Sequence, residues 1–348
     1  MAISLKPTDK VDNLRTRILT LAVMALAGLA AGCGGQSGAS ESEGAKKLTL
    51  VAYSTPKEAY AEIIPAFAKT SQGKGVSFDQ SYGSSGEQAR AVEGGLAADL
   101  VALSLEPDVN KLVDAKLVDA AWNKDDYDGF VTNSVVSFAV RKGNPKGIET
   151  WDDLLKPGVE VITPNPFTSG GAKWNIMAAY GAQLEQGKSE AEALDYLGKL
   201  FKQVPVLDKS AREALQTFAA GKGDVLIAYE NEAITAQQKG EELDYVTPDE
   251  TILIENPVAA VDKTKERRTV DAFIEFLRGD EAQKIFAAKG YRSVKPELVD
   301  EKRYPKPAQL FEIGKFGGWS KVNDEFFEPR GGKIAEIFKS QGKSTASG

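Results

Sequence analysis

Four short motifs place hydroxyl side chains where helices are expected to begin. TPKE at 55–58, SGEQ at 85–88 and SARE at 210–213 each have Ser or Thr followed three residues later by Glu or Gln, as in a capping box. The fourth, TSGG at 168–171, has two glycines, which let another group approach the backbone closely. Because N–H groups at a helix start lack intrahelical acceptors and carry partial positive charge, the four motifs together predict an oxyanion site.

Each motif taken alone is more simply interpreted as an ordinary helix cap, since nearly every helix needs one. Their distribution favours the functional interpretation, because two motifs fall in the first half of the mature chain and two in the second. A ligand would then be held across a cleft, at the carboxyl ends of strands.

Most catalytic chemistry is excluded by composition. The chain has no histidine and one cysteine, Cys33. This removes histidine-based triads, metal sites and general bases, and leaves Ser–Lys pairs, carboxylate pairs or oxygen-ligated metals. None of these is arranged convincingly in the sequence, so we expect no catalytic residue, no metal site and no cofactor. A secreted ester hydrolase is the alternative from another class.

Alternating strand and helix patterns must position the motifs, and they predict an α/β fold. Apolar runs predict strands at 48–53, 76–78, 100–103, 135–140, 159–163, 204–207, 225–228 and 258–261. Amphipathic runs predict helices around 60–67, then at 85–93, 107–115, 170–185, 190–201, 212–220, 269–277 and 281–288. A chain this long usually exceeds a single core, so two lobes are expected.

The N-terminus has the pattern of an export signal. Four basic residues precede an apolar run at 18–31, which is too short to span a bilayer and ends in LAAGC at 29–33. This pattern resembles a bacterial lipobox and predicts a signal peptide at 1–32 with lipid attached to Cys33. Residues 33–47, rich in Gly, Ser and Glu, are then a lipid-attached flexible tether that holds the protein at the outer face of the cell membrane.

Charge argues against a nucleic-acid partner. Removing residues 1–32 removes four basic and two acidic residues, so the formal net charge changes from −7 to −9. Nucleic-acid affinity comes mostly from neutralising phosphates, which an acidic chain does poorly.

Several longer segments resemble the bacterial sulfate-binding proteins. They are DQSYGSSG at 79–86, VITPNP at 161–166, SGGAKWN at 169–175, DVLIAYENE at 224–232 and FGGW at 316–319. The resemblance runs in order from about residue 48 to about residue 339. It implies a two-lobed periplasmic-binding fold of type II, with a mixed sheet flanked by helices in each lobe and the ligand in the interlobe cleft. It also implies a monomer that captures sulfate and delivers it to the permease and ATPase subunits of an ABC importer.

The resemblance also assigns the ligand contacts, residue by residue. In the first lobe they are the N–H of Ser54 and both the N–H and the hydroxyl of Ser85. In the second lobe the contacts are the Ser169 hydroxyl, the N–H groups of Gly170, Gly171 and Ala211, and the Tyr229 side chain. Arg212 is expected behind this shell, although an exposed or carboxylate-paired arginine is the simpler interpretation.

Tyr229 is the main departure, because relatives often have a tryptophan there. A phenol can accept as well as donate, so the preference could shift toward thiosulfate or another tetrahedral oxyanion such as molybdate. A tyrosine that merely packs at the cleft is the structural alternative. Because no assigned contact is a carboxylate that could accept a phosphate proton, we predict that phosphate is rejected.

The expected division of the chain follows from the order of these elements. Lobe 1 is predicted at 48–132 plus 258–340, and lobe 2 at 133–257. Hinges are expected near 132–134 and 256–258, where the chain would pass between the lobes.

Overall fold

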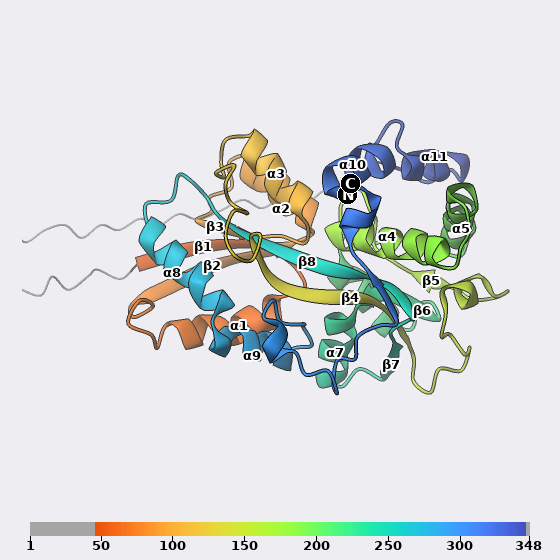
Figure 1. The fold of residues 1–348 in the computed structure, drawn as a ribbon, viewed down its shortest axis with the longest axis horizontal. Helices are drawn as coiled ribbons and strands as arrows, with labels where there is room; N and C mark the ends of the chain where they lie inside the picture. Colours follow the sequence, from red (N-terminus) through yellow and green to blue (C-terminus); the bar gives the residue numbers. More distant parts are fainter. Residues whose placement is uncertain (1–45, 346–348) are drawn as a thin grey trace, which may run out of the picture. The chain divides into compact units, whose positions relative to one another are not determined.

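The computed structural model describes residues 46–345. The predicted signal peptide at 1–32, Cys33 and almost all of the tether at 33–47 lie outside this part. Within it, the strands follow the hydrogen-bonded order β2-β1-β3-β8-β4-β6-β5, with β7 beside β4 and β9 beside β8 (Figure 1). Their bounds are β1 Lys46–Tyr53, β2 Val76–Gly83, β3 Leu100–Ala102, β4 Phe130–Arg141, β5 Val161–Ile162, β6 Val225–Tyr229, β7 Leu243–Val246, β8 Glu250–Ala260 and β9 Gln309–Phe311.

Helices cover both faces of this sheet. Their bounds are α1 Lys57–Phe67, α2 Ser85–Glu93, α3 Glu106–Asp114, α4 Gly170–Glu185, α5 Glu190–Lys202, α6 Ala211–Ala219, α7 Glu230–Gln238, α8 Arg267–Arg278, α9 Asp280–Ala288, α10 Gly318–Phe327 and α11 Lys333–Ser340. None of the helices within residues 46–345 combines the length and the apolar character needed to cross a membrane.

The first lobe is built on the parallel strands β1, β2 and β3. One face of these strands packs on α1, α8 and α9, with Tyr60, Phe67 and Phe273 in the core. The other face packs on α2 and α3, with Val92 and Leu112 in the core. Their carboxyl ends lead into the segments that carry the first two motifs.

The second lobe has β4, β5, β6 and β7 at its centre. Its larger core lies against α4 and α5 and contains Trp151, Trp174 and Phe201. A smaller core, with Phe218 and Ala233, lies under α6 and α7 on the other face. α4 is buried on nearly every side, as expected for a helix with small and apolar residues around its whole circumference.

Two long strands, β4 and β8, run from one lobe to the other (Figure 1). They pair antiparallel, and Thr132 lies opposite Asn256 in this pairing. The Thr132 hydroxyl also donates to Asn256 Oδ1 at 3.2 Å. The two predicted hinge segments are therefore neighbours in the crossing ribbon, and bending at this ribbon remains a prediction.

Packing groups the C-terminal segment differently from the predicted division. Phe311, Trp319 and Phe338 share one hydrophobic core with α4 and α5, although 258–340 was expected in lobe 1. Gly181 makes room for this packing, since a Cβ there would lie 2.3 Å from the Phe311 ring. The chain thus contributes 258–288 to the first lobe and then crosses back to cover α4.

One predicted strand, at 204–207, is not a strand in the structure. Pro205 has no N–H to donate to a ladder. The segment still runs beside β5, because Val161 N donates to the carbonyl of Gln203 at 2.9 Å and Asn165 N donates to that of Asp208 at 2.8 Å.

Candidate oxyanion site

A small, partly open cavity of about 10 Å³, as measured with a water-sized sphere, lies where the two lobes meet. The lining residues are Tyr53, Ser54, Thr55, Gly83, Ser84, Ser85, Ser104, Ser169, Gly171, Ala211 and Tyr229. Six of the seven predicted ligand contacts are therefore gathered in one place, although they come from positions 54 to 229. The seventh, Gly170, adjoins the cavity beside Gly171.

Three helices begin at this cavity. Ser85 is the first residue of α2, Gly170 and Gly171 are the first two of α4, and Ala211 is the first of α6. Helical geometry leaves the N–H groups of such residues without intrahelical acceptors. The site therefore combines four of these N–H groups with the partial positive charge of three helix ends, a favourable environment for an anion.

Gly170 and Gly171 have different structural roles. A Cβ on Gly170 would lie 2.2 Å from Leu105 Cδ2 and 2.9 Å from the Ser104 side chain, so only glycine lets the first lobe approach the start of α4 this closely. A Cβ on Gly171 would make ordinary contacts, at 3.4 Å to Ser169 Oγ and 3.7 Å to Tyr229 Cε1. Close approach to the backbone was expected for a ligand, and at Gly170 it is used by the protein itself.

The Ser85 hydroxyl is already engaged within the protein. It donates to Asp108 Oδ2 at 2.5 Å and accepts from Ser104 N at 2.9 Å. Burial raises the pKa of Asp108, partly offset by the positive charge of Lys173. Because a hydroxyl has one proton, Ser85 can donate to a ligand only when Asp108 no longer receives that proton, for example when Asp108 is itself protonated.

Tyr229 ends β6 and is buried, with its hydroxyl 2.8 Å from Ser104 Oγ. Burial raises the pKa of Tyr229 well above its ordinary value, so the phenol keeps its proton. The Ser169 hydroxyl, on the neighbouring wall, accepts from Ala172 N at 3.4 Å as the cap of α4. That bond uses a lone pair and leaves the Ser169 proton available.

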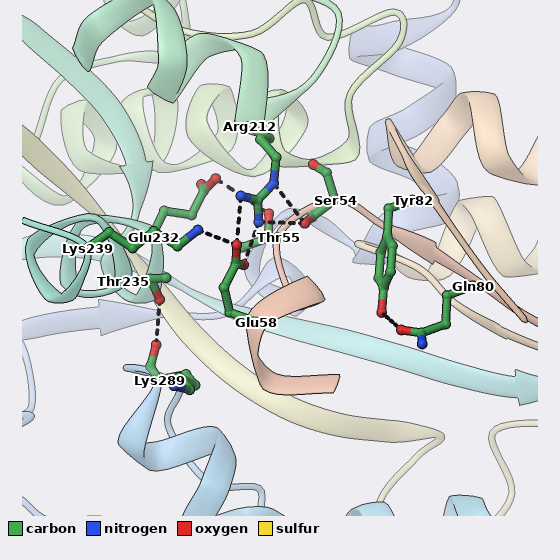
Figure 2. Close-up of polar contacts among 10 residues, drawn as sticks. All are labelled: Ser54, Thr55, Glu58, Gln80, Tyr82, Arg212, Glu232, Thr235, Lys239 and Lys289. Carbon is green, nitrogen blue, oxygen red and sulfur yellow. Dashed lines mark hydrogen bonds and ion pairs between the residues drawn. The ribbon is translucent and has the colours of Figure 1, made fainter. Parts of the chain in front are cut away.

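Arg212 joins the lobes at the edge of the cavity (Figure 2). From α6 it donates two hydrogen bonds to the Ser54 carbonyl, at 3.2 and 3.0 Å, and two to the Glu58 carboxylate, at 2.9 and 2.5 Å. Lys239, which directly follows α7, also contacts Glu58. Burial alone would raise the pKa of Glu58, but the hydrogen bonds from both cations outweigh it and hold the pKa below its ordinary value. Arg212 is thus paired with a carboxylate and does not line the cavity.

Glu232 connects the charged side chains of Arg212, Glu58 and Lys239 to the wall of the cavity (Figure 2). Its carboxylate accepts from Tyr229 N at 3.2 Å and, across the lobes, from the Thr55 hydroxyl at 3.5 Å. Burial raises the pKa of Glu232 to about 7, although Arg212 lies nearby.

Two of the predicted capping boxes are wrong. The Thr55 side chain makes the contact with Glu232, and α1 begins after Pro56 without a side-chain cap. Ser84, and not Ser85, is the residue that precedes α2. At Ser210 the predicted helix cap is confirmed, since its side chain accepts from Glu213 N at 3.2 Å. The reciprocal bond of a capping box is absent, because the Glu213 side chain accepts from Lys209 N. In the first lobe the hydroxyls of Thr55 and Ser85 make tertiary contacts with Glu232 and Asp108, which a local sequence pattern does not specify.

Further contacts between the lobes enclose the cavity. Gly86 N donates to the Thr168 carbonyl at 3.2 Å, and Trp174 Nε1 donates to the Ser104 carbonyl at 2.9 Å. The structure therefore represents a closed arrangement of the lobes, with direct hydrogen bonds between them beside the cavity.

Sequence reasoning missed Ser104 and Asp108. Ser104 lies two residues after the short strand β3, and serine near the end of a strand is too common to be a signal. Asp108 was hidden in the first turn of α3, where an acidic residue is expected for helix stability alone. Within residues 46–345, no three Cys, Asp or Glu side chains gather in a way that could hold a metal ion.

Comparison with known proteins identifies the family. The family model described as bacterial extracellular solute-binding protein matches residues 48–292. A protein from Synechococcus elongatus, named sulfate-binding protein, is 46% identical over 85% of this chain and 89% of its own length. This chain belongs to the bacterial sulfate-binding protein family. The family is extracellular, which places the protein outside the cytoplasm, and its members are named for binding and transport.

Other relatives agree in extent and fold. The sulfate-binding protein of Escherichia coli is 41% identical over 84% of this chain and 93% of its own length. The structure of the sulfate-binding protein SubI from Mycobacterium tuberculosis superposes with a TM-score of 0.79 at 43% identity, covering 81% of this chain and all of that one. A thiosulfate-binding protein from Pseudomonas aeruginosa is less similar, at 37% identity over 84% of this chain and 92% of its own length. The predicted two-lobed type II fold is confirmed.

Proposed function

We propose that the protein captures sulfate in the cavity between its lobes and delivers it to an ABC importer. The observation that carries this proposal is that three helix N-termini and the neutral side chains of Ser169 and Tyr229 meet at one site between the lobes. The naming of the relatives supports sulfate as the ligand. Ser54, Ser85, Ser169, Gly170, Gly171, Ala211 and Tyr229 are the proposed contacts.

The proposed site works by fixed local dipoles, not by a cationic side chain. Each N–H or O–H bond to a charged acceptor contributes roughly 1.5 to 3 kcal/mol. Micromolar affinity needs about 8 kcal/mol in total after the cost of association. The chain's negative net charge opposes this only weakly, because solvent-exposed carboxylates are screened beyond roughly 8 to 10 Å.

Arg212 contributes to the site indirectly in this proposal. Its two bonds to the Ser54 carbonyl hold the segment that follows β1 in place, so that the Ser54 N–H is positioned at the cavity. Its charge is neutralised by Glu58, which leaves the ligand bound by dipoles.

Calorimetric titration of the purified mature protein with sulfate, thiosulfate, molybdate and phosphate tests the proposal. We expect sulfate to bind most tightly and phosphate at least about tenfold more weakly, which corresponds to about 1.4 kcal/mol. The carboxylates of Asp108 and Glu232 bond residues that line the cavity, but neither carboxylate lines it. Phosphate binding within tenfold of sulfate would refute the proposed selectivity, and tighter thiosulfate binding would support the second candidate, a thiosulfate-binding protein.

The same proposal holds that the protein is a monomer without catalytic activity. It is attached to the outer face of the cell membrane by lipid on Cys33. Mass spectrometry of the membrane fraction would detect a diacylglyceryl group on Cys33, and Cys33→Ala should release the protein into the medium. Assays on generic phosphate and sulfate esters should show no turnover, whereas free sulfate should raise the melting temperature.

A further inference from the structure

Tyr229 lines the cavity, and its hydroxyl can act either as a hydrogen-bond donor or as an acceptor. In a related pocket with tryptophan at this position, the indole can only donate, whereas a phenol can donate its proton or accept another. A buried phenol that accepts from the ligand would favour protonated oxyanions. Something in the pocket has to direct the Tyr229 proton if the protein is to prefer a fully deprotonated dianion.

Ser104 is held rigidly beside this phenol. It is buried, with 1% of its surface exposed. Its N–H donates to Ser85 Oγ at 2.9 Å, and its carbonyl accepts from Trp174 Nε1 and Asn256 Nδ2, both at 2.9 Å. These three bonds fix the Ser104 backbone between the two lobes and the crossing ribbon, which leaves its hydroxyl 2.8 Å from that of Tyr229.

The two hydroxyls share two protons, one of which lies between their oxygens. If Ser104 donates to the phenol oxygen, the phenol proton is left for the ligand and a phenol lone pair is occupied. Sulfate, which has only acceptors, fits this arrangement. A protonated anion would need the opposite one, with the phenol accepting from the ligand.

We propose that Ser104 is a positioning residue that directs the Tyr229 proton toward the bound oxyanion and thereby selects fully deprotonated anions. This inference rests on the proposed function and deepens it. Tyr229 touches the ligand, and Ser104 acts through it. The high pKa of Tyr229 supports the inference, because the phenol retains the proton to be directed.

A double-mutant cycle measured by sulfate calorimetry tests the proposal. Ser104→Ala should weaken sulfate binding by roughly 3- to 10-fold, the loss expected for one hydrogen bond. The double variant Ser104→Ala/Tyr229→Phe should bind sulfate no more than about twofold more weakly than Tyr229→Phe alone. The reason is that Ser104 acts on the ligand through the Tyr229 hydroxyl, which Tyr229→Phe already removes. The preference for sulfate over phosphate, measured by competition, should also narrow in Ser104→Ala.

Ser137→Ala is the matched control. Ser137 is also a buried serine whose hydroxyl lies 2.8 Å from another hydroxyl, that of Thr247, but it does not line the cavity. It should bind sulfate like the parent protein, so a loss equal to that of Ser104→Ala would contradict the proposal.

Three other outcomes would overturn it. The first is an unchanged sulfate affinity in Ser104→Ala. The second is that Ser104→Ala weakens sulfate binding as much in the Tyr229→Phe background as in the parent protein. The third is that the preference for sulfate over phosphate does not narrow in Ser104→Ala. An equal loss in the Tyr229→Phe background would mean that Ser104 donates directly to the ligand. A parent protein that binds thiosulfate and not sulfate would refute the proposed ligand but not the role of Ser104, which the same cycle would then test with thiosulfate.

Discussion

The guanidinium of Arg212 lies 2.5 Å from the Glu58 carboxylate, joining α6 of the second lobe to α1 of the first (Figure 2). Both side chains are partly shielded from water, with exposed fractions of 26% and 20%. The same guanidinium holds the Ser54 carbonyl. This pair therefore stabilises the closed arrangement and the cavity wall together.

Breaking this pair should loosen the closed form. We expect Glu58→Gln to weaken sulfate binding by roughly 3- to 10-fold, mainly through faster release, because the open form gains relative stability. Stopped-flow release combined with calorimetry would measure this. Arg267→Ala, which removes an exposed ion pair with Asp271, is the control and should leave binding unchanged. Equal release rates for Glu58→Gln and the parent would contradict the role of the pair.

Loss of either proposed neutral side-chain donor should weaken binding without unfolding the protein. We expect Tyr229→Phe and Ser169→Ala each to raise the sulfate Kd by roughly 10-fold or more, since a bond to a charged acceptor is lost. Ser169→Ala should also lower stability by about 1 kcal/mol, because Ser169 caps α4. Calorimetry and thermal unfolding without sulfate separate the two effects. If both variants kept the parent affinity, the cavity would not be the ligand site.

Stability should decrease with rising pH because of Glu232. Its pKa is raised to about 7 in the folded protein, from 4.5 for an unperturbed glutamate, so folding favours its protonated form. The unfolded chain loses that proton first, and the free energy of unfolding should fall between about pH 4.5 and pH 7, by on the order of 3 kcal/mol at most.

Glu232→Gln should reduce this decline, since an amide does not titrate and still accepts from Tyr229 N. Part of the decline should remain, because burial also raises the pKa of Glu255 to about 7. Urea unfolding at several pH values between 5 and 8 would measure it. Glu275→Gln, a change at an exposed helix position, should follow the parent curve. A Glu232→Gln curve parallel to that of the parent would show that folding does not raise the pKa of this carboxylate.

The buried ion pair between Arg292 and Glu230 should be important for folding. Its atoms lie 2.8 Å apart with 8% and 2% of the two side chains exposed, and Asn133 pairs with the Arg292 backbone at the crossing ribbon. We expect Arg292→Met to lower the free energy of unfolding by about 3 to 5 kcal/mol, because Glu230 is left charged and buried. Denaturant unfolding would measure this, and Lys199→Ala, which removes an exposed pair, should cost under about 1 kcal/mol. A similar small cost for Arg292→Met would show that Glu230 is stabilised by its other contacts.

The local elements were largely predictable, because their signals are local. The start of α4 at Gly170 and the cap at Ser210 follow from hydroxyls and glycines next to helix-forming runs. The strand expected at 204–207 failed because one proline cancels a short apolar pattern. The extent of β4 and β8 was underestimated, since polar residues such as Thr132, Asn133 and Asn256 interrupt their apolar patterns.

The sequence by itself determined the α/β class, the exclusion of histidine chemistry and the seven proposed ligand contacts, but not the roles of Ser104 and Asp108. Periodicity, composition and family motifs are properties of neighbouring residues and need no third dimension. Only the tertiary structure decided which hydroxyls remain available, because hydrogen-bond partners come from distant positions. Ser85 is engaged by Asp108, Thr55 reaches Glu232, and Tyr229 meets Ser104, 125 residues earlier in the chain. The ligand that the pocket can bind depends on which hydroxyl protons are available. Their hydrogen-bond partners are fixed only when the two lobes pack together.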